Sequence, residues 1–280
     1  MKNKSFIFHI GPQKSATTWI YRNLKEHPEI CTTHQDKTHY YDMFYTKGNV
    51  WYASHFEANK KADAKMFDPT PTYIRSSLAL KRIAIEHPNA KLALCMRNPI
   101  ERAFSHYWHE KKKGTIHFNF NDVLSNYDLF ANWIEPGFYA EHIVNLHKFF
   151  HKNQVLAQKF DDITIDPERF LHKLCQFYEI DPSFNFLWTH KKANAARPRQ
   201  NFFGKLEQKM LHVNDKFPEN LQPLTKLTVN ALKKINHTNY EKLTDTDEDT
   251  LKALSEVCLP EIERLEKLLN IELNSWKKYG

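Results

Sequence analysis

The chain has 280 residues, of which 41% are hydrophobic and 14% aromatic, so it can fold around a core and is not expected to be disordered. Its formal net charge of +7 favours a partner that carries phosphate, sulfate or carboxylate groups, although a lysine-rich surface alone gives the same charge. Lys and Arg are spread along the chain and form no zinc-finger or RNA-binding motif, so nucleic acid is not an expected partner.

The cysteines and the hydrophobic segments exclude further classes of protein. Cys31, Cys95, Cys175 and Cys258 are far apart and form no Cys-x-x-Cys pair, so we expect neither a metal site nor a disulfide framework. No stretch has the pattern of a signal peptide or of a membrane span. We therefore expect a cytoplasmic protein without a membrane span.

Three apolar runs predict β-strands, at residues 6–10, 91–96 and 154–160. The first two are each followed by a loop and then by a helical pattern. Strands that alternate with helices favour a parallel sheet with crossover helices. We therefore predict an α/β fold, with a central parallel sheet flanked by helices and a P-loop-like phosphate-binding turn.

The first strand is followed by a loop that suits an anion. In Gly-Pro-Gln-Lys-Ser-Ala-Thr-Thr-Trp, residues 11–19, Gly11 permits a sharp turn before the next helix. Unpaired backbone N–H groups at such a helix start attract anions, and Lys14 adds a positive charge. The Walker loop has a Gly directly before its Lys, and the absence of that Gly here disfavours an ATPase or kinase. A helix start with a solvated lysine is the alternative. Hydroxyl donors in the loop are Ser15, Thr17 and Thr18.

A second strand-to-helix turn repeats this arrangement. An apolar strand ends at Arg97, after which Asn98 can cap a helix and Pro99 suits its first position. The Arg97 guanidinium and the Ser105 hydroxyl, two turns into the helix, can converge on one anion. Alternatively, Arg97 pairs with Glu101 and Ser105 is a surface residue.

The C-terminal part is predicted to be mainly helical. Apolar residues recur at helical spacing between residues 245 and 269, and Pro260 is expected to kink or restart this helix. The chain contains no internal repeat and no low-complexity linker. We therefore expect one domain over residues 1–280, with its helical part starting at about residue 200.

Together, the two turns resemble the nucleotide-binding motifs of sulfotransferases that use 3′-phosphoadenosine 5′-phosphosulfate (PAPS). Residues 11–19 resemble the family's loop for the 5′-phosphosulfate. Arg97 and Ser105, eight residues apart as in the family, resemble its motif for the 3′-phosphate. The resemblance is greatest to the heparan sulfate branch and its bacterial relatives, because further segments are similar to it in order. These segments are residues 38–56, 68–73, 135–139, 160–180 and 270–276.

This resemblance implies an enzyme of the EC 2.8.2 type that moves a sulfuryl group from PAPS to an acceptor hydroxyl or amine without a metal. The acceptor it implies is a carbohydrate or a small molecule. Lys14 is implied as the catalytic cation. The implied contacts to PAPS are Gly11, Lys14, Ser15, Ala16, Thr17, Thr18, Trp19, Arg97, Ser105, Arg197 and Arg199. The last two belong to a basic loop, and the alternative is that this loop is solvated and does not contact the nucleotide.

The acceptor needs a base to take its proton, and here the chain departs from the family. The family's glutamate corresponds to Lys37, which cannot accept a proton unless its pKa is strongly lowered. Asp36 is the first candidate for the base, His39 the second, and Asp68 a further one. Two other functions stay open, namely a nucleotide-binding protein that lacks a base and a P-loop kinase-like phosphotransferase.

Overall fold

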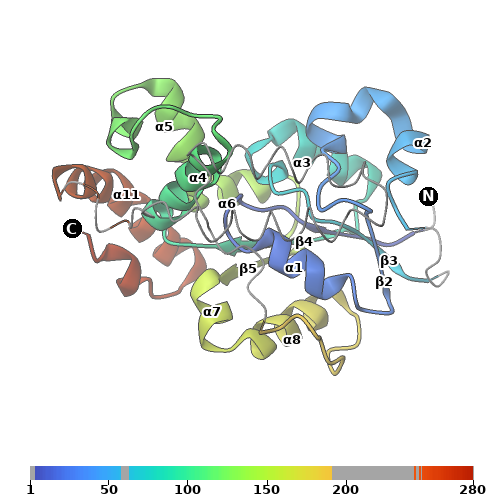
Figure 1. The fold of residues 1–280 in the computed structure, drawn as a ribbon. Coiled ribbons are helices and arrows are strands. Elements are labelled where there is room, and N and C mark those ends of the chain that lie inside the picture. Colours follow the sequence, from blue (N-terminus) through green and yellow to red (C-terminus); the bar gives the residue numbers. More distant parts are fainter. Residues whose placement is uncertain (1–3, 58–62, 191–242, 244–245, 247, 280) are drawn as a thin grey trace, which may run out of the picture.

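The computed structural model describes residues 4–57, 63–190, 243, 246 and 248–279. In this part of the chain, five strands form one parallel sheet in the order β2-β3-β1-β4-β5 (Figure 1). The predicted α/β fold with a parallel sheet is confirmed. The strands are β1 (Phe6–His9), β2 (Ile30–Thr32), β3 (Lys65–Asp68), β4 (Lys91–Met96) and β5 (Val155–Lys159).

The three predicted strands correspond to β1, β4 and β5, whereas β2 and β3 were missed. The strand β2 has only three residues, too few to show a period in the sequence. The strand β3 ends in Asp68, an acidic residue that is disfavoured in strands and yet is fully buried here. Both segments form strands because they pair with neighbouring strands in the sheet. A local sequence pattern does not reveal such pairing.

Helices cover both faces of the sheet, and each face has its own apolar core (Figure 1). On one face, Ile20 of α1 and Leu174 of α8 pack with Ile7 of β1. On the other face, Leu80 of α3 and Ile143 of α6 belong to a larger core that also includes α4 and α11. The helices are α1 (Thr17–Leu24), α2 (Gly48–Ala53), α3 (Ser77–Glu86), α4 (Pro99–Lys113), α5 (Tyr127–Trp133), α6 (Tyr139–Leu146), α7 (Phe160–Ile165), α8 (Pro167–Tyr178) and α11 (Glu248–Leu269).

The predicted C-terminal helix is present as α11. It continues through Pro260, so the helix does not restart at this residue, and the alternative of a kink stays a prediction. Its buried residues, among them Leu254 and Cys258, pack into the core beside α4 and α6. The division into a single domain with a helical part from about residue 200 stays a prediction, because most of that part lies outside the described residues.

The helix α4 begins as its sequence predicts. The Asn98 side chain accepts hydrogen bonds from the backbone N–H groups of Ile100 and Glu101, at 3.0 and 3.3 Å, and Pro99 is the first helical residue. The cap fixes where the chain turns from β4 into α4, and it therefore fixes the position of Arg97.

All five strands run in the same direction, so their carboxyl ends lie at one edge of the sheet. The loop before α1 follows β1, the segment that contains Asp36 follows β2, and Arg97 follows β4. Ligands of open parallel sheets bind at this edge. The topology thus brings the predicted site residues that the structure describes to one side of the molecule.

Candidate active site

The loop after β1 has a backbone that only a few residues tolerate. Gly11 has φ +112°, and a Cβ atom there would lie 2.0 Å from the carbonyl oxygen of Pro71, so no larger residue fits. Lys14 and Ala16 also have positive φ, at 70° and 64°, whereas Ser15 between them does not. Such alternation turns successive backbone N–H groups toward one point and forms an anion-binding concavity. Left-handed non-glycine residues cost about 1–3 kcal/mol each, which is typical of a binding site.

Two residues of the loop that carry hydroxyl groups, Ser15 and Thr17, are buried. The Thr17 hydroxyl has no hydrogen-bond partner in the described part of the chain, and the Ser15 hydroxyl lies beside that of Tyr139. A buried hydroxyl without a partner costs about 1–3 kcal/mol. A bound phosphate would accept this hydrogen bond, so the chemistry of the loop fits the 5′ end of PAPS.

Trp19 contributes to the loop differently from the other residues. Its indole Nε1–H donates to the backbone carbonyl of Thr189 at 3.3 Å, and its ring packs edge-on against Phe170. The side chain therefore belongs to the core beneath the loop. Only the backbone of Trp19 is suited to contact a nucleotide.

Lys14 lies among other positive charges. Burial and, to a smaller extent, the charges of Lys112, Lys113 and Arg97 lower its pKa to about 8, while Glu110 opposes them. Lys14 and Arg97, predicted separately from two turns, are thus close enough to interact electrostatically. Mutual repulsion in such a cluster is relieved when an anion binds between the charges.

Two histidines of α4 lie near Lys14. Burial lowers the pKa of His106 to about 3 and that of His109 to about 4, and the charge of Lys14 contributes in both cases. The His106 ring stacks on Trp133 with 5.2 Å between the ring centroids. Both histidines are therefore neutral at pH 7, and α4 runs past the loop.

Arg97 has several neighbours at the end of β4. Its guanidinium lies over the ring of Phe160 at 4.8 Å, and its Nη2 atom is 3.5 Å from Glu101 Oε2. The Arg97–Glu101 pair expected as the alternative therefore forms, but it is long, and the buried Nε of Arg97 has no partner among the described residues. Ser105 is half-buried two turns further along α4.

The segment after β2 joins the phosphate loop through Asp36. The Thr18 hydroxyl donates to Asp36 Oδ2 at 3.2 Å. Lys37, at the position of the family's glutamate, is exposed. Asp36, and not its neighbour Lys37, therefore contacts the loop after β1.

His39 is held by two residues that the sequence analysis missed. Its Nδ1 atom is 3.4 Å from Asp42 Oδ2 and 3.2 Å from the hydroxyl of Thr72, which also donates to Asp42. Burial raises the pKa of Asp42, but the hydrogen bonds from His39 and Thr72 outweigh this effect and hold the pKa below its usual value. The ionised carboxylate thereby orients the imidazole. The spacing of His39 and Asp42, three residues apart, is the only sequence signal for this pair.

Asp68 has a structural role at the end of β3. Its buried carboxylate anchors the segment that carries Asp36 and His39, because Thr38 donates to it at 2.8 Å. Burial raises its pKa, and its hydrogen bonds oppose this shift. With both oxygens engaged in this way, Asp68 is not a suitable base. Its other donors are the backbone and side chain of Thr70 and the hydroxyls of Tyr52 and Tyr73.

Arg197 and Arg199 lie outside the described residues. Within those residues, no group of three or more His, Cys, Asp and Glu side chains is arranged to hold a metal ion. None of the described helices is both long and apolar enough to cross a membrane.

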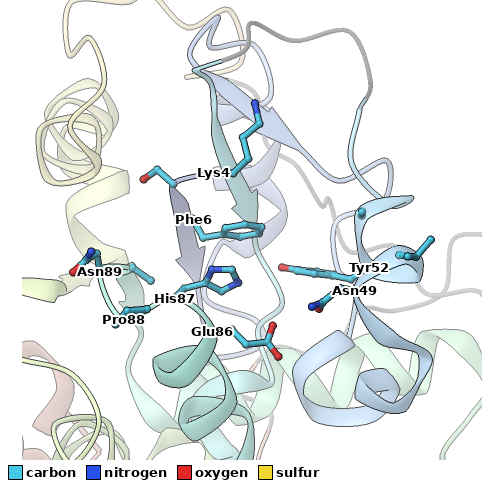
Figure 2. Close-up of a pocket in the computed structure, with 12 residues that line it drawn as sticks. Lys4, Phe6, Asn49, Tyr52, Glu86, His87, Pro88 and Asn89 are labelled. Atoms are coloured by element: carbon cyan, nitrogen blue, oxygen red, sulfur yellow. The ribbon is translucent and has the colours of Figure 1, made fainter. Parts of the chain in front are cut away.

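A cavity of about 990 Å³ lies at the opposite end of the sheet (Figure 2). It is lined by Lys4 just before β1, by Phe6 at the start of β1, by Tyr52 of α2, and by Glu86 and His87 at the end of α3. The amino ends of the strands form this edge, whereas the phosphate loop follows their carboxyl ends. The cavity is therefore separate from the candidate site.

Comparisons with known proteins agree with the fold. The family model described as sulfotransferase domain matches residues 4–256. The bifunctional heparan sulfate N-deacetylase/N-sulfotransferase 4 of Mus musculus is 27% identical over 219 residues, 70% of this chain and 24% of that protein. The corresponding enzyme 2 of Homo sapiens is 26% identical over 198 residues, 64% of this chain and 22% of that protein. The chain thus spans about a quarter of the length of these curated relatives.

Among solved structures, a sulfotransferase from Alicyclobacillus acidocaldarius superposes with a TM-score of 0.68 and covers 98% of this chain and 99% of its own. At 18% sequence identity, this likeness shows a shared fold. The family match extends over most of the chain and confirms the resemblance predicted from the two phosphate-binding turns. The chain belongs to the sulfotransferase domain family.

Proposed function

We propose that this sulfotransferase domain transfers the sulfuryl group of PAPS to an acceptor hydroxyl or amine. The observation that carries the proposal is that Lys14 and Arg97 follow the carboxyl ends of two adjacent parallel strands, where the charge of Arg97 helps to lower the pKa of Lys14. PAPS carries a phosphosulfate and a 3′-phosphate on one nucleoside, so it needs two cationic contacts. One of them would come from each turn.

The loop after β1 would bind the 5′-phosphosulfate. The hydroxyls of Ser15, Thr17 and Thr18 would donate to the 5′-phosphate, one of them being a buried group without another described partner. Gly11, Ala16 and Trp19 would contribute through the backbone. These roles are supported by the positive φ angles of the loop and by the resemblance to the family.

Lys14 would act on the bond that breaks. The acceptor atom attacks sulfur, the bond between sulfur and the bridging oxygen breaks, and its electron pair stays on the leaving 3′,5′-adenosine bisphosphate (PAP). Negative charge therefore builds on that oxygen. A cation at this position stabilises the transition state more than the ground state.

The 3′-phosphate would bind Arg97 and Ser105. Arginine presents a planar set of donors that matches a phosphate, and the Nε of Arg97 has no described partner. Arg197 and Arg199 are proposed as further phosphate contacts on the resemblance alone.

Asp36 would take the proton of the acceptor. Its hydrogen bond to Thr18 supports this role, because the same residue adjoins the loop that would hold the sulfuryl group. His39, oriented by Asp42, is the alternative base. Transfer without a metal is part of the proposal and rests on the family resemblance.

A carbohydrate acceptor is supported by the curated relatives, whose names specify heparan sulfate N-sulfotransferases. A small molecule is the alternative acceptor. A cytoplasmic location stays a prediction from the sequence.

The test is transfer of labelled sulfate from PAPS, in the presence of EDTA, to N-deacetylated heparosan and to a small phenol. We expect labelled product with one of them, and product formation about 10²- to 10³-fold slower with Lys14→Ala. Thermal unfolding with PAP or with ATP and Mg²⁺ separates the alternatives, because a ligand of the native state raises the melting temperature. A larger rise with ATP would indicate a kinase, and a rise with PAP without any transfer would indicate a binding protein.

A further inference from the structure

The C-terminal turn, Asn274–Lys277, contacts the start of α4. The backbone carbonyl of Trp276 accepts a hydrogen bond of 3.1 Å from Asn98 Nδ2, and the other amide atom of Asn98 caps α4. One side chain thus links the C-terminal turn to the helix that follows Arg97. Figure 1 shows the C-terminal end of the chain on the same side of the molecule as α4 and α11.

The Trp276 side chain makes a second link. Its indole Nε1–H donates to Asp161 Oδ2 at 2.9 Å, and the ring is buried against Tyr139. Asp161 follows Phe160, whose ring lies against the guanidinium of Arg97. Trp276 therefore connects the chain after β4 with the chain after β5. Arg97 belongs to the first of these segments and contacts Phe160 of the second.

Lys278, the residue after this turn, contacts Glu101, whose carboxylate would compete with a phosphate for Arg97. Glu101 Oε1 is 2.6 Å from Lys278 Nζ, whereas Glu101 Oε2 is 3.5 Å from Arg97 Nη2. The hydrogen bond with Glu101 raises the pKa of Lys278. A carboxylate held on Arg97 would have to be displaced by an incoming phosphate. Glu101 is thus shared between the two cations, and its contact with Lys278 is the shorter one.

We propose that Lys278 and Trp276 are positioning residues for the 3′-phosphate site. Lys278 binds one oxygen of the Glu101 carboxylate and so keeps the contact of the other oxygen with Arg97 long, and Trp276 fixes the chain segments that follow β4 and β5 at this arginine. The inference rests on the proposed function, because it takes Arg97 as the contact to the 3′-phosphate. It adds Lys278, 177 positions after Glu101, to a site whose other described contacts lie between Gly11 and Ser105.

The experiment compares the Kd of PAP with that of adenosine 5′-monophosphate, which lacks the 3′-phosphate. In Lys278→Ala, Glu101 turns to Arg97, and we expect PAP to bind about two- to fivefold more weakly, the effect of an exposed charge pair. Binding of the monophosphate is expected to stay unchanged. Adding Glu101→Gln to Lys278→Ala removes the competing charge and is expected to restore the affinity for PAP.

Trp276→Phe tests the second link, since it keeps a ring against Tyr139 and removes the donor to Asp161. We expect the same selective loss of PAP affinity. Lys277→Ala is the matched control, because Lys277 belongs to the same turn but pairs with Glu266 of α11 at 2.7 Å. It is expected to bind both nucleotides like the wild type. Lys278 is half-exposed, so its variant is expected to fold even if Trp276→Phe does not.

Equal weakening of both nucleotides in Lys278→Ala, or no rescue by Glu101→Gln, overturns the inference. Arg97→Ala separates it from the proposed function. If Arg97→Ala selectively weakens PAP while Lys278→Ala does not, the inference fails and the proposed function stands. If Arg97→Ala leaves PAP binding unchanged, both fail.

Discussion

The Thr18 hydroxyl donates a 3.2 Å hydrogen bond to Asp36 and so joins the phosphate loop after β1 to the segment after β2. If Asp36 is the base, Asp36→Asn keeps an acceptor for Thr18 but cannot take a proton. We expect kcat to fall about 10²- to 10⁴-fold, the usual contribution of a general base, with little change in PAP affinity. Steady-state transfer kinetics and calorimetric PAP binding measure the two quantities.

Lys37→Gln is the control, because Lys37 is the exposed neighbour at the position of the family's glutamate. It is expected to turn over at nearly the wild-type rate. A variant Asp36→Asn that keeps its kcat, together with a His39→Asn variant that loses it, would transfer the role of base to His39 and its partner Asp42.

Lys14→Ala is expected to affect turnover more than binding. Removing one group that stabilises charge in the transition state lowers kcat about 10²- to 10³-fold. PAP has no sulfuryl group to lose, so its binding is expected to weaken much less than turnover. Single-turnover transfer and PAP titration check this, and equal losses in both measurements would argue that Lys14 only binds the nucleotide.

The pKa of Lys14, lowered to about 8, predicts how PAP binding depends on pH. Only the protonated amine attracts the nucleotide, so affinity is expected to be full below pH 8 and to decline as pH rises through this value. Lys14→Arg keeps its charge and removes the decline between pH 7 and 9.5. In a Lys112→Ala/Lys113→Ala variant, less repulsion moves the decline to higher pH. Calorimetry across this range tests both shifts, and a flat wild-type profile would contradict the assignment.

The two strand-to-helix turns were predictable because their signals are local, whereas their role in binding anions stays a prediction. Gly11 and Lys14 follow an apolar strand directly, and the Asn98–Pro99 pair specifies the start of α4 within three residues. Family resemblance then connected them, although they are more than eighty residues apart. The structure adds that β1 and β4 are adjacent, which brings the charges of Lys14 and Arg97 within range of each other and which no local pattern contains.

What the sequence analysis missed depends on contacts between distant segments. Thr72 reaches His39 only because β3 lies beside β2 in the sheet. Lys278 reaches Glu101 across most of the chain. Asp68 can likewise be buried because Thr38, Tyr52 and Tyr73, from three separate segments, donate hydrogen bonds to it. The sequence around Asp68 does not reveal these donors.

Gly11→Ala is expected to destabilise the fold and abolish PAP binding. The new Cβ would lie 2.0 Å from the Pro71 carbonyl oxygen, and this is backbone that cannot rotate away. Gly114→Ala is the matched control, since Gly114 also has a positive φ, of 73°, but has nothing within 4 Å of a Cβ. The control therefore carries only the left-handed penalty of about 1–2 kcal/mol. Similar urea midpoints for the two variants would show that the contact with Pro71 is unimportant.

His9 predicts that the protein loses stability in mild acid. It is 1% exposed on β1, neither ring nitrogen has a described partner, and burial lowers its pKa to about 3. The unfolded chain, with a histidine pKa near 6.5, therefore takes up the proton first. The stability that neutral His9 provides is complete above pH 6.5 and is lost progressively as pH falls towards 3. At pH 5 the loss from this residue is about 2 kcal/mol.

Urea unfolding at pH 7 and pH 5 measures this loss. His9→Leu, which cannot take up a proton, is expected to lose about 2 kcal/mol less than the wild type between the two values. His172→Gln is the control, because His172 is exposed on α8 and is expected to leave the wild-type difference intact. His106, whose pKa burial lowers to about 3, adds to the difference in all these proteins. If His9→Leu lost as much stability as the wild type between the two pH values, protonation of other groups would be responsible.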